Sequence, residues 1–436
     1  MGVQLMKTAY VAMSTDIFHP GHINIINQAA KYGKVIVGIL TDEAIATYKR
    51  PPILNTQERE QIAASFKNVD KTVVQETLDY TDNLRKLKPD YVVHGDDWRT
   101  GLLQKIRDRV IEVLAEWGGE LIEVPYTQNV SGGDLSKKFT NLTNTPDQRL
   151  SKLKKLLQLK PYIRAIDASN GLTGLIAENV RIMDESTMMA KEFDAMWISS
   201  LCDSAFKGKP DIELVDLTSR INTINEIMEV TTKPIILDGD TGGKLEHFSF
   251  HVKTLERIGV SAVIIEDKTG LKQNSLFGTD VEQVLDDPAD FAAKIAAGKR
   301  AQATRDFMII ARLESLIAGK SVEDAMMRAK IYIEAGVDAI MIHSKEKDGS
   351  DIFAFMKQFR AFSQTIPLVV VPTTYNQFTE EELHAKGANI IIHANHLLRS
   401  AYPAMVKTAE SILIHGRSKE ASNTMCMPIK EVLTFI

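Results

Sequence analysis

Two aspartates, Asp238 and Asp240, stand at the end of an apolar run, within residues 235–243, Ile-Ile-Leu-Asp-Gly-Asp-Thr-Gly-Gly. A buried strand that delivers two carboxylates into a glycine-rich turn offers the hard oxygen ligands that Mg2+ takes in proteins. Glu266, followed by Asp267, ends the next apolar run and adds further carboxylates. The alternative interpretation is a pair of ordinary strand-to-helix turns in which aspartate caps a helix. The Asp-x-Asp pattern alone leaves both open.

Groups that bind anions gather at later strand ends and in one loop. Arginine offers a planar fork of donors, and asparagine and serine donate to phosphoryl oxygens. Carboxylates that hold a metal, beside donors that hold a phosphate, form a phosphoryl-transfer site. A single buried Arg or His is more often structural, so the prediction depends on their number. The candidates are Arg312, His343, Ser344, Lys272, Asn274 and Ser275.

A second constellation, His19-Pro-Gly-His22, lies between an apolar run and a helical pattern near the start of the chain. Two imidazoles at a helix N-terminus can donate to phosphate oxygens, and the helix dipole adds positive potential. Gly21 lets a nucleotide approach the backbone. A helix start with two solvated histidines is the alternative, because a bare His-x-Gly-His is a weak motif.

The elements that position these residues follow an alternating strand–helix rhythm. Between residues 7 and 138, short apolar runs at 8–13, 35–40 and 91–94 alternate with helical patterns at 23–32 and 56–66. This alternation predicts a Rossmann-like parallel sheet with crossover helices. The polar stretch 141–148 and an amphipathic helix at 149–159 then interrupt the rhythm. We therefore expect domains at 1–140 and 161–436, joined by a linker at 141–160.

The second domain carries the number of strands typical of a (β/α)8 barrel. In such barrels the C-terminal strand ends carry the active site. The expected strands are 163–168, 195–199, 235–238, 262–266, 308–313, 339–343, 368–371 and 390–393.

Composition narrows the class of protein. The 436 residues contain only two cysteines, which fits a reducing compartment rather than a disulfide scaffold. The net charge of −5 gives no support for nucleic-acid binding. No signal peptide and no apolar run of about 18 residues is present, so we expect a cytoplasmic protein without a membrane span.

Six motifs make residues 163–436 resemble phosphoenolpyruvate mutase, within the isocitrate lyase superfamily. The resemblance implies a (β/α)8 barrel, assembled as dimers or tetramers that exchange a helix. It also implies that Mg2+ assists the interconversion of phosphoenolpyruvate and phosphonopyruvate. The motifs are Trp197-Ile-Ser-Ser-Leu201, Asp238-Gly-Asp-Thr-Gly242, Glu266-Asp-Lys-Thr-Gly-Leu-Lys-Gln-Asn-Ser275, Ala311-Arg-Leu-Glu314, Ile342-His-Ser-Lys345 and Val371-Pro-Thr-Thr-Tyr375.

The resemblance also implies roles. Asp238 would contact Mg2+ directly, and Asp240 and Glu266 would act through its waters. Arg312, His343 and Asn274 would hold the phosphoryl group in flight, near Asp211. Lys272, Ser275 and Ser344 are further substrate-binding candidates. Ser199, Ser200 and Leu201 would grip the pyruvyl carboxylate, with Ser200 replacing the glycine of the family's Ser-Gly-Leu.

Related enzymes are the competing hypotheses for the barrel. Isocitrate and methylisocitrate lyases use a Lys-Lys-Cys-Gly-His loop, whereas the loop that starts at Lys268 contains no cysteine. Phosphonopyruvate hydrolase shares most of the site but has threonine where Asn274 stands. Asn274 therefore favours a mutase, with the hydrolase as the nearest alternative.

Residues 7–138 resemble the glycerol-3-phosphate cytidylyltransferase family of HxGH nucleotidyltransferases, chiefly through His94-Gly-Asp-Asp-Trp98 beside the histidine motif. The implied reaction is attack of a phosphate or phosphonate oxygen on CTP. His19 and His22 would stabilise the transition state. The family's Arg-Thr-x-Gly-x-Ser-Thr-Thr element is altered to residues 126–133, Tyr-Thr-Gln-Asn-Val-Ser-Gly-Gly, and Tyr48 replaces an expected lysine. The implied nucleotide-binding residues are Lys49, Arg50, Arg59, Asp96, Asp97, Trp98 and Ser131.

The fusion of these two domains resembles the bifunctional cytidylyltransferase–mutases of phosphonate biosynthesis. The expected acceptor of CMP is a small phosphonate, such as 2-hydroxyethylphosphonate or 2-aminoethylphosphonate. Two alternatives stay open. The first domain could be catalytically degenerate, and the whole chain could be a scaffold with two inactive sites.

Overall fold

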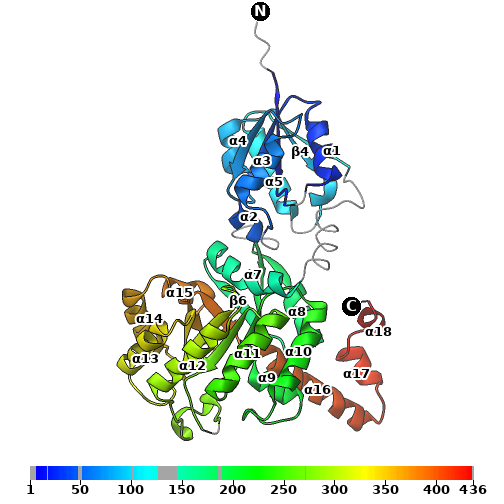
Figure 1. The fold of residues 1–436 in the computed structure, drawn as a ribbon. Helices are drawn as coiled ribbons and strands as arrows, with labels where there is room; N and C mark the ends of the chain where they lie inside the picture. Colours follow the sequence, from blue (N-terminus) through cyan, green and yellow to red (C-terminus); the bar gives the residue numbers. More distant parts are fainter. Residues whose placement is uncertain are drawn as a thin grey trace, which may run out of the picture. The chain divides into compact units, whose positions relative to one another are not determined.

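The computed structural model describes residues 6–16, 18–47, 52–100, 103–125, 145–184, 189–270 and 272–434, and the chain forms two compact units (Figure 1). Unit 1 comprises Met1–Ile163 and Asn179–Phe193. Unit 2 comprises Arg164–Glu178 and Asp194–Ile436.

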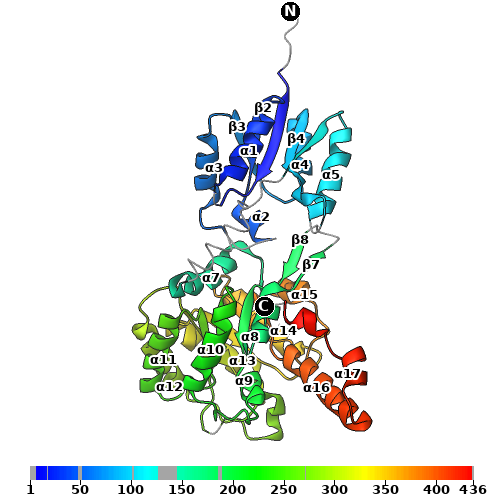
Figure 2. The ribbon, with the colours of Figure 1, turned by 90° about the vertical axis from the view of Figure 1, so that its right-hand side faces the viewer.

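Unit 1 is built on a parallel five-stranded sheet in the order β3-β2-β1-β4-β5 (Figure 2). This arrangement confirms the expected Rossmann-like domain. The strands are β1 (Thr8–Met13), β2 (Lys34–Leu40), β3 (Lys71–Gln75), β4 (Tyr91–Gly95) and β5 (Glu120–Val124). The helices are α1 (Pro20–Ala29), α2 (Asp42–Ala46), α3 (Thr56–Ala64), α4 (Thr81–Leu87), α5 (Gln104–Ala115) and the 3-10 turn η1 (Asp96–Trp98).

Both faces of the sheet of unit 1 are buried, and β1 shows why. Successive side chains of a strand point to opposite faces. Tyr10 and Ala12 pack into one cluster with residues of α2, α4 and α5, and the alternate residues Ala9 and Val11 pack into another with residues of α1 and α3. A strand buried on both faces reads as a continuous apolar run, which is how β1 appeared in the sequence.

Two further elements group with unit 1. Helix α7 (Pro146–Leu159) buries Leu150, Leu153 and Leu156 on one side. The antiparallel hairpin of β7 (Arg181–Asp184) and β8 (Met189–Glu192) follows the first barrel strand in sequence and was not predicted.

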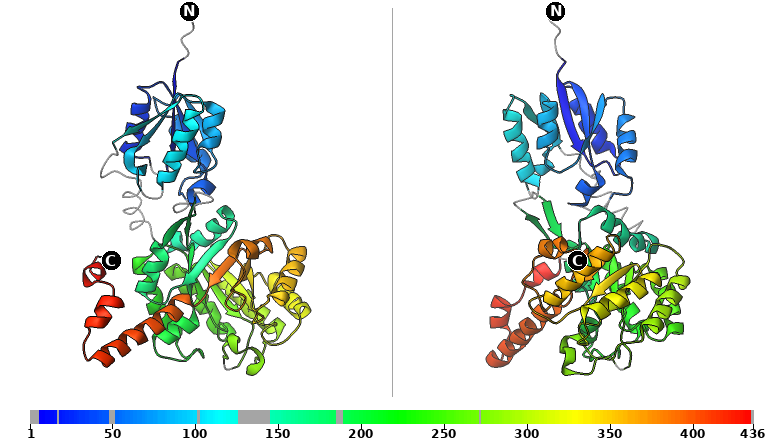
Figure 3. Two further views of the ribbon diagram at one scale, coloured as in Figure 1. Left: turned by 180° about the vertical axis from the view of Figure 1, so that it is seen from behind. Right: turned by 90° about the vertical axis from the view of Figure 1, so that its left-hand side faces the viewer.

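Unit 2 is a closed barrel of eight parallel strands (Figure 3). Every expected strand is present within a residue of its predicted end, which confirms the (β/α)8 fold. The strands are β6 (Ile163–Asp167), β9 (Ala195–Ile198), β10 (Ile235–Asp238), β11 (Ala262–Glu266), β12 (Met308–Leu313), β13 (Ala339–Ile342), β14 (Leu368–Val370) and β15 (Ile390–His393). The helices are α8 (Gly171–Asn179), α9 (Ser200–Phe206), α10 (Leu217–Val230), α11 (Leu245–Ile258), α12 (Pro288–Ala301), α13 (Val322–Glu334), α14 (Ser350–Phe362), α15 (Glu380–Ala385) and the 3-10 segment η3 (Ser275–Asp280).

The last helices leave the barrel wall. Helix α16 (His396–His415) projects outward and is followed by α17 (Lys419–Thr424) and α18 (Ile429–Val432) (Figures 2 and 3). The start of α16 is fixed by Asp167 at the end of β6, which accepts hydrogen bonds from the backbone N–H of Leu397 at 3.1 Å and of Leu398 at 3.4 Å. Among the described residues, no helix combines the length and apolar character needed to cross a bilayer.

Candidate active site

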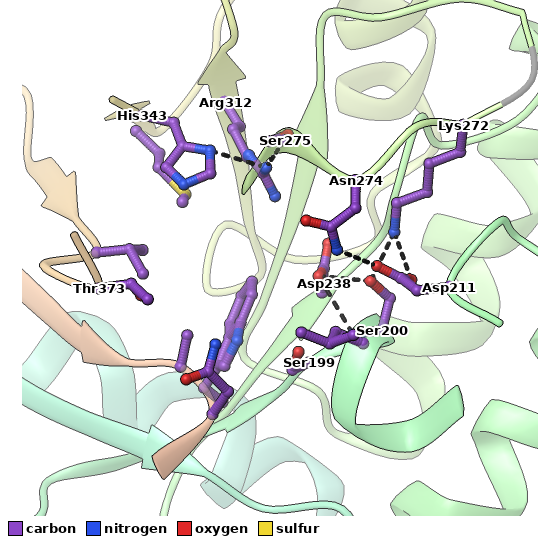
Figure 4. A pocket seen from close by; sticks show the side chains of 16 residues that line it. Ser199, Ser200, Asp211, Asp238, Lys272, Asn274, Ser275, Arg312, His343 and Thr373 are labelled. Atoms are coloured by element: carbon purple, nitrogen blue, oxygen red, sulfur yellow. Dashed lines mark hydrogen bonds and ion pairs between the residues drawn. The ribbon is translucent and has the colours of Figure 1, made fainter. Parts of the chain in front are cut away.

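A cavity opens where the C-terminal ends of the barrel strands meet, and we call it the barrel cavity (Figure 4). It brings together ten residues that the sequence predicted for the site. They come from the ends of β9, β10, β12 and β13, from α9 and the segment after it, and from the loop that leads into η3. Its lining comprises Trp197, Ser199, Ser200, Leu201, Asp211, Asp238, Lys272, Asn274, Ser275, Arg312, Met341, His343, Val371, Thr373, Ala394 and Asn395.

Asp238 stands at the end of β10, against the first turn of α9. Its Oδ2 accepts hydrogen bonds from the Ser200 backbone N–H at 3.2 Å and from Ser200 Oγ at 2.8 Å. Burial alone would raise the pKa of Asp238, but the charges of Lys272, Arg312 and Arg220 hold it below its usual value. The carboxylate is therefore ionised at neutral pH. Ser199 caps α9 by accepting a hydrogen bond from the N–H of Cys202, so the start of this helix faces the cavity.

Lys272 joins three acidic or hydroxyl groups on this side. Its ammonium donates to Ser200 Oγ at 2.7 Å, to Asp211 Oδ1 at 2.8 Å and to Asp240. Asp211 also accepts a hydrogen bond from Asn274 Nδ2 at 2.9 Å. Burial opposes the ammonium form, but the nearby carboxylates, Asp240 first, raise the pKa of Lys272. These contacts bring the loop residues to the strand ends, as predicted.

Asp240 lies behind this cluster and does not line the cavity. It is buried with a φ of 53°, an unusual conformation for a residue other than glycine. Its Oδ2 pairs with Arg220 Nη1 at 3.1 Å, and Lys272 holds Oδ1. Arg220, on α10, was not nominated from the sequence, because nothing in its local pattern distinguishes it from a surface arginine.

The opposite side of the cavity is basic. Arg312 Nη2 donates to Ser275 Oγ at 2.7 Å and lies 2.9 Å from His343 Nδ1. Burial, and then the charge of Arg312, lower the pKa of His343, so the imidazole is neutral at pH 7. Glu314, two residues after Arg312 and fully buried, contacts all three side chains. Arg312 and His343 thus face the cavity wall that carries Asp238. Their donors can bind an anionic group that lies in the cavity between the two walls.

Glu266 behaves unlike the other carboxylates. It is buried, and neither of its side-chain oxygens has a hydrogen-bond partner among the described residues; Arg312 Nη2 at 3.4 Å and Lys268 Nζ at 3.5 Å are its nearest cations. Burial raises its pKa to about 7. In the described part of the chain, no three metal-ligating side chains converge on one point. Mg2+ usually takes one or two carboxylates and keeps several waters, so Asp238 on the cavity wall and the unsatisfied oxygens of Glu266 fit a hydrated divalent ion.

Ser344 does not support its nominated role. It is buried, does not line the cavity, and donates its hydroxyl to Asp351 Oδ2 at 2.6 Å. The side chain after His343 alternates to the other face of the strand end, away from the reacting side. Sequence reasoning also overlooked Ala394 and Asn395, although they directly follow β15 and the strand-end rule could have found them.

In unit 1, His19 is the N-cap of α1 and His22 lies in its first turn, so the helix begins before the expected residue 23. The N–H of Gly21 donates to His19 Nδ1 at 3.1 Å, and the N–H of His19 donates to His22 Nδ1 at 3.4 Å. When these rings are neutral, both carry their proton on Nε2. β1, which precedes the motif, pairs with β4, which precedes Asp96 and Asp97. Here the strand order reverses, which is where open α/β sheets bind ligands.

Two nominated nucleotide-binding residues have other partners. Trp98 is buried, stacks on His94 with ring centroids 3.7 Å apart, and donates Nε1–H to Glu123 at 3.0 Å. Arg59 is fully buried, and all five of its N–H donors are used, by Leu54 O, Ser14 O, Leu40 O, Asp42 and Thr56. In this conformation Arg59 holds loops together and presents no donor to a triphosphate. Lys49, Arg50 and Ser131 lie outside the described residues.

Comparison with known proteins agrees with this division. Residues 153–413 match the family model described as Phosphoenolpyruvate phosphomutase, and residues 14–135 match the one described as Cytidylyltransferase-like. A phosphoenolpyruvate phosphomutase of Tetrahymena pyriformis is 36% identical over 61% of this chain and 84% of its own length. A phosphonopyruvate hydrolase of Variovorax sp. is 35% identical over 62% of this chain and 91% of its own length. The crystal structure of a phosphonopyruvate hydrolase with oxalate and Mg2+ superposes with a TM-score of 0.57 and 31% identity, covering 67% of this chain and 94% of that one.

Proposed function

Because the chain belongs to the phosphoenolpyruvate phosphomutase family, we propose that its barrel interconverts phosphoenolpyruvate and phosphonopyruvate in phosphonate biosynthesis. The observation that carries the proposal is the two-sided barrel cavity. Acidic Asp238 and the start of α9 form one side, and Arg312 and His343 form the other. The reaction moves a phosphoryl group between C3 and the enol oxygen of one pyruvyl skeleton. The enzyme must therefore hold a pyruvyl unit and an anionic phosphoryl group at once.

The residues divide these tasks. The first turn of α9, at Ser199–Leu201, would orient the carboxylate of the pyruvyl unit. Arg312 and His343 would stabilise the charge on the phosphoryl group, because donors fixed in a water-poor site cost no reorganisation during the reaction. Asp238 would hold Mg2+ directly, with Asp240 and Glu266 acting through its waters. When bound, that ion supplies Lewis-acid stabilisation of negative charge on oxygen.

Asn274 favours a mutase over a hydrolase. Its amide is fixed by Asp211 at the cavity wall, on the same side as Lys272. A side chain held there limits the space for a water molecule that would intercept the phosphoryl group. Phosphonopyruvate hydrolysis is the second candidate, because a hydrolase is as similar to this chain as a mutase is.

Phosphorus NMR of the full chain with phosphonopyruvate and Mg2+ tests the assignment. Phosphoenolpyruvate as product supports the mutase, phosphate with pyruvate supports the hydrolase, and no conversion contradicts both. Asp238→Ala should abolish turnover, whereas Asp290→Ala, at an exposed carboxylate in the first turn of α12, should not. A fully active, Mg2+-independent Asp238→Ala variant would remove the metal assignment.

For unit 1 we propose transfer of CMP from CTP to a small phosphonate such as 2-hydroxyethylphosphonate or 2-aminoethylphosphonate. The support is the pair His19 and His22 at the start of α1, beside the turn that carries Asp96 and Asp97. His22→Ala should stop pyrophosphate release from CTP and leave the barrel reaction unchanged. If calorimetry shows no binding of CTP or ATP to the wild type, unit 1 is a catalytically degenerate domain.

The chain is also proposed to form a homo-oligomer, a dimer or a tetramer. Large apolar side chains of the described residues are exposed along α16 and beyond: Tyr402, Met405, Leu413, Ile414, Met425, Met427, Ile429 and Leu433. Exposed apolar patches of this kind mark interaction surfaces. Light scattering of the purified chain decides this point, since a monomer at micromolar concentration would contradict it.

A further inference from the structure

Glu314 occupies a fixed position directly behind the basic side of the barrel cavity. It follows β12, is fully buried, and does not line the cavity. Its backbone N–H donates to Asp267 Oδ1 at 2.8 Å. Asp267 is held in turn by Tyr332 OH at 2.9 Å and Arg328 Nη1 at 3.2 Å. The backbone of Glu314 is therefore anchored to α13 independently of any ligand.

The carboxylate of Glu314 contacts three side chains that do line the cavity, each from a different segment. Oε1 accepts a hydrogen bond from Arg312 Nε and lies 3.1 Å from His343 Nδ1. Oε2 accepts a hydrogen bond from Ser275 Oγ at 2.6 Å. Burial would raise the pKa of Glu314, but the charge of Arg312 holds it low. One carboxylate thus ties β12, β13 and η3 together.

These contacts decide which donors face the cavity. Arg312 uses Nε for Glu314, and Nη2 for Ser275 and His343, while Nη1 makes no hydrogen bond to any described residue. His343, which lines the cavity, is held through Nδ1, and its Nε2 makes no hydrogen bond to any described residue. Glu314 also competes with Glu266 for the same guanidinium, since Arg312 Nη2 lies 3.4 Å from Glu266.

We infer that Glu314 is a positioning residue for the phosphoryl-binding side of the site, an inference that rests on the proposed function. It contacts no substrate. It fixes Arg312, His343 and Ser275 so that Arg312 Nη1 and His343 Nε2 point at one anionic group, and it keeps Arg312 from neutralising Glu266. The pyruvyl side of the cavity, at Asp238 and the start of α9, does not depend on it.

Two ligands separate the sides of the site. Oxalate carries the two adjacent oxygen-bearing carbons of an enolpyruvate and no phosphoryl group. Sulfopyruvate carries a sulfonate in place of the phosphonate. With Mg2+ present, calorimetry should show that Glu314→Gln, which is similar in size but uncharged, binds oxalate within about 3-fold of the wild type. The same variant should bind sulfopyruvate about 10- to 100-fold more weakly, the factor for hydrogen bonds to a charged group.

Glu256→Gln is the matched control, because Glu256 is also buried and also accepts hydrogen bonds, from the N–H groups of Ala303 at 2.7 Å and Thr304 at 2.6 Å, away from the cavity. It should bind both ligands as the wild type does. Equal weakening of both ligands by Glu314→Gln, or weakening of neither, would overturn the inference. If the wild type binds both ligands but converts no phosphonopyruvate, the proposed reaction fails while the comparison still decides the role of Glu314. A wild type that binds neither ligand would overturn both.

Discussion

Replacing Gly239 by alanine should damage the site without removing any functional group. Gly239 lies between Asp238 and Asp240, and its N–H donates to Ile264 O at 2.7 Å. A Cβ at this position would lie 2.6 Å from Val263 Cγ2 and 2.9 Å from Ile264 O. The first neighbour is a methyl group that can rotate, but the second belongs to the backbone of β11. Glycine is therefore required by close approach of two strands.

The magnitude follows from these distances. Ordinary contact begins near 3.4 Å, so the turn and β11 must separate by the difference from 2.9 Å. Overpacking of this kind typically costs about 1–3 kcal/mol of unfolding free energy. The shift moves Asp238 and Asp240 together, and misplacement of catalytic groups by about 1 Å costs on the order of 10²-fold in rate. Because the required displacement is about half of 1 Å, we expect turnover to fall at least about 10-fold.

Gly171→Ala is the control. Gly171 is at the start of α8, and its Cβ would meet Glu226 O at 3.6 Å and Val230 Cγ2 at 3.8 Å, both ordinary contacts. That change should leave the barrel's unfolding midpoint unchanged or slightly higher, because alanine is the better helix former. Thermal unfolding and phosphorus NMR turnover are measured for both variants. A Gly239→Ala protein with the stability and turnover of the wild type would refute the close-approach argument.

Three further predictions concern unit 1 and the independence of the barrel. Hydrogen bonds from Arg107 lower the pKa of Glu123 to about 2 from 4.5, so its stabilisation is present above pH 4.5 and is lost as pH falls toward 2. Glu123→Gln should therefore lower the free energy of unfolding of unit 1 at pH 7 by about 1–3 kcal/mol, seen as a lower melting temperature, and this loss of stability should vanish in acid. A loss of stability that does not change with pH would argue against the ion pair. Arg59→Met should lower the free energy of unfolding of unit 1 by about 3 kcal/mol or more, measured by thermal unfolding. A variant that melts like the wild type but no longer binds CTP would instead support the nucleotide-binding role expected from the sequence. A chain that starts at Thr145 should fold and turn over phosphonopyruvate like the full chain, and insoluble products from several nearby start points would show that the first domain is needed.

Both folds and most of the candidate barrel site are predictable from the pattern of residues along the chain. Parallel strands that are buried on both faces are continuous apolar runs. In the run 262–266, the change to the polar residue Glu266 marks the end of the strand. The C-terminal ends of all strands of a parallel barrel meet at one rim. A polar residue at the end of one strand is therefore expected to lie near the polar residues at the ends of the others. For this reason the sequence pattern predicts that Asp238, Arg312 and His343 lie close together.

Packing between distant segments sets which side of its element each polar residue faces and which partner it takes. Ser344 faces away from the cavity, and Arg59 is a buried tie between loops. Glu314 holds side chains that line the cavity, and Arg220 holds Asp240 behind it. These outcomes depend on contacts between residues that are distant in the chain, such as Arg220 with Asp240 or Glu314 with His343. Local sequence pattern encodes burial and periodicity, but it does not encode such pairings, because their energy arises only once separate elements have packed together.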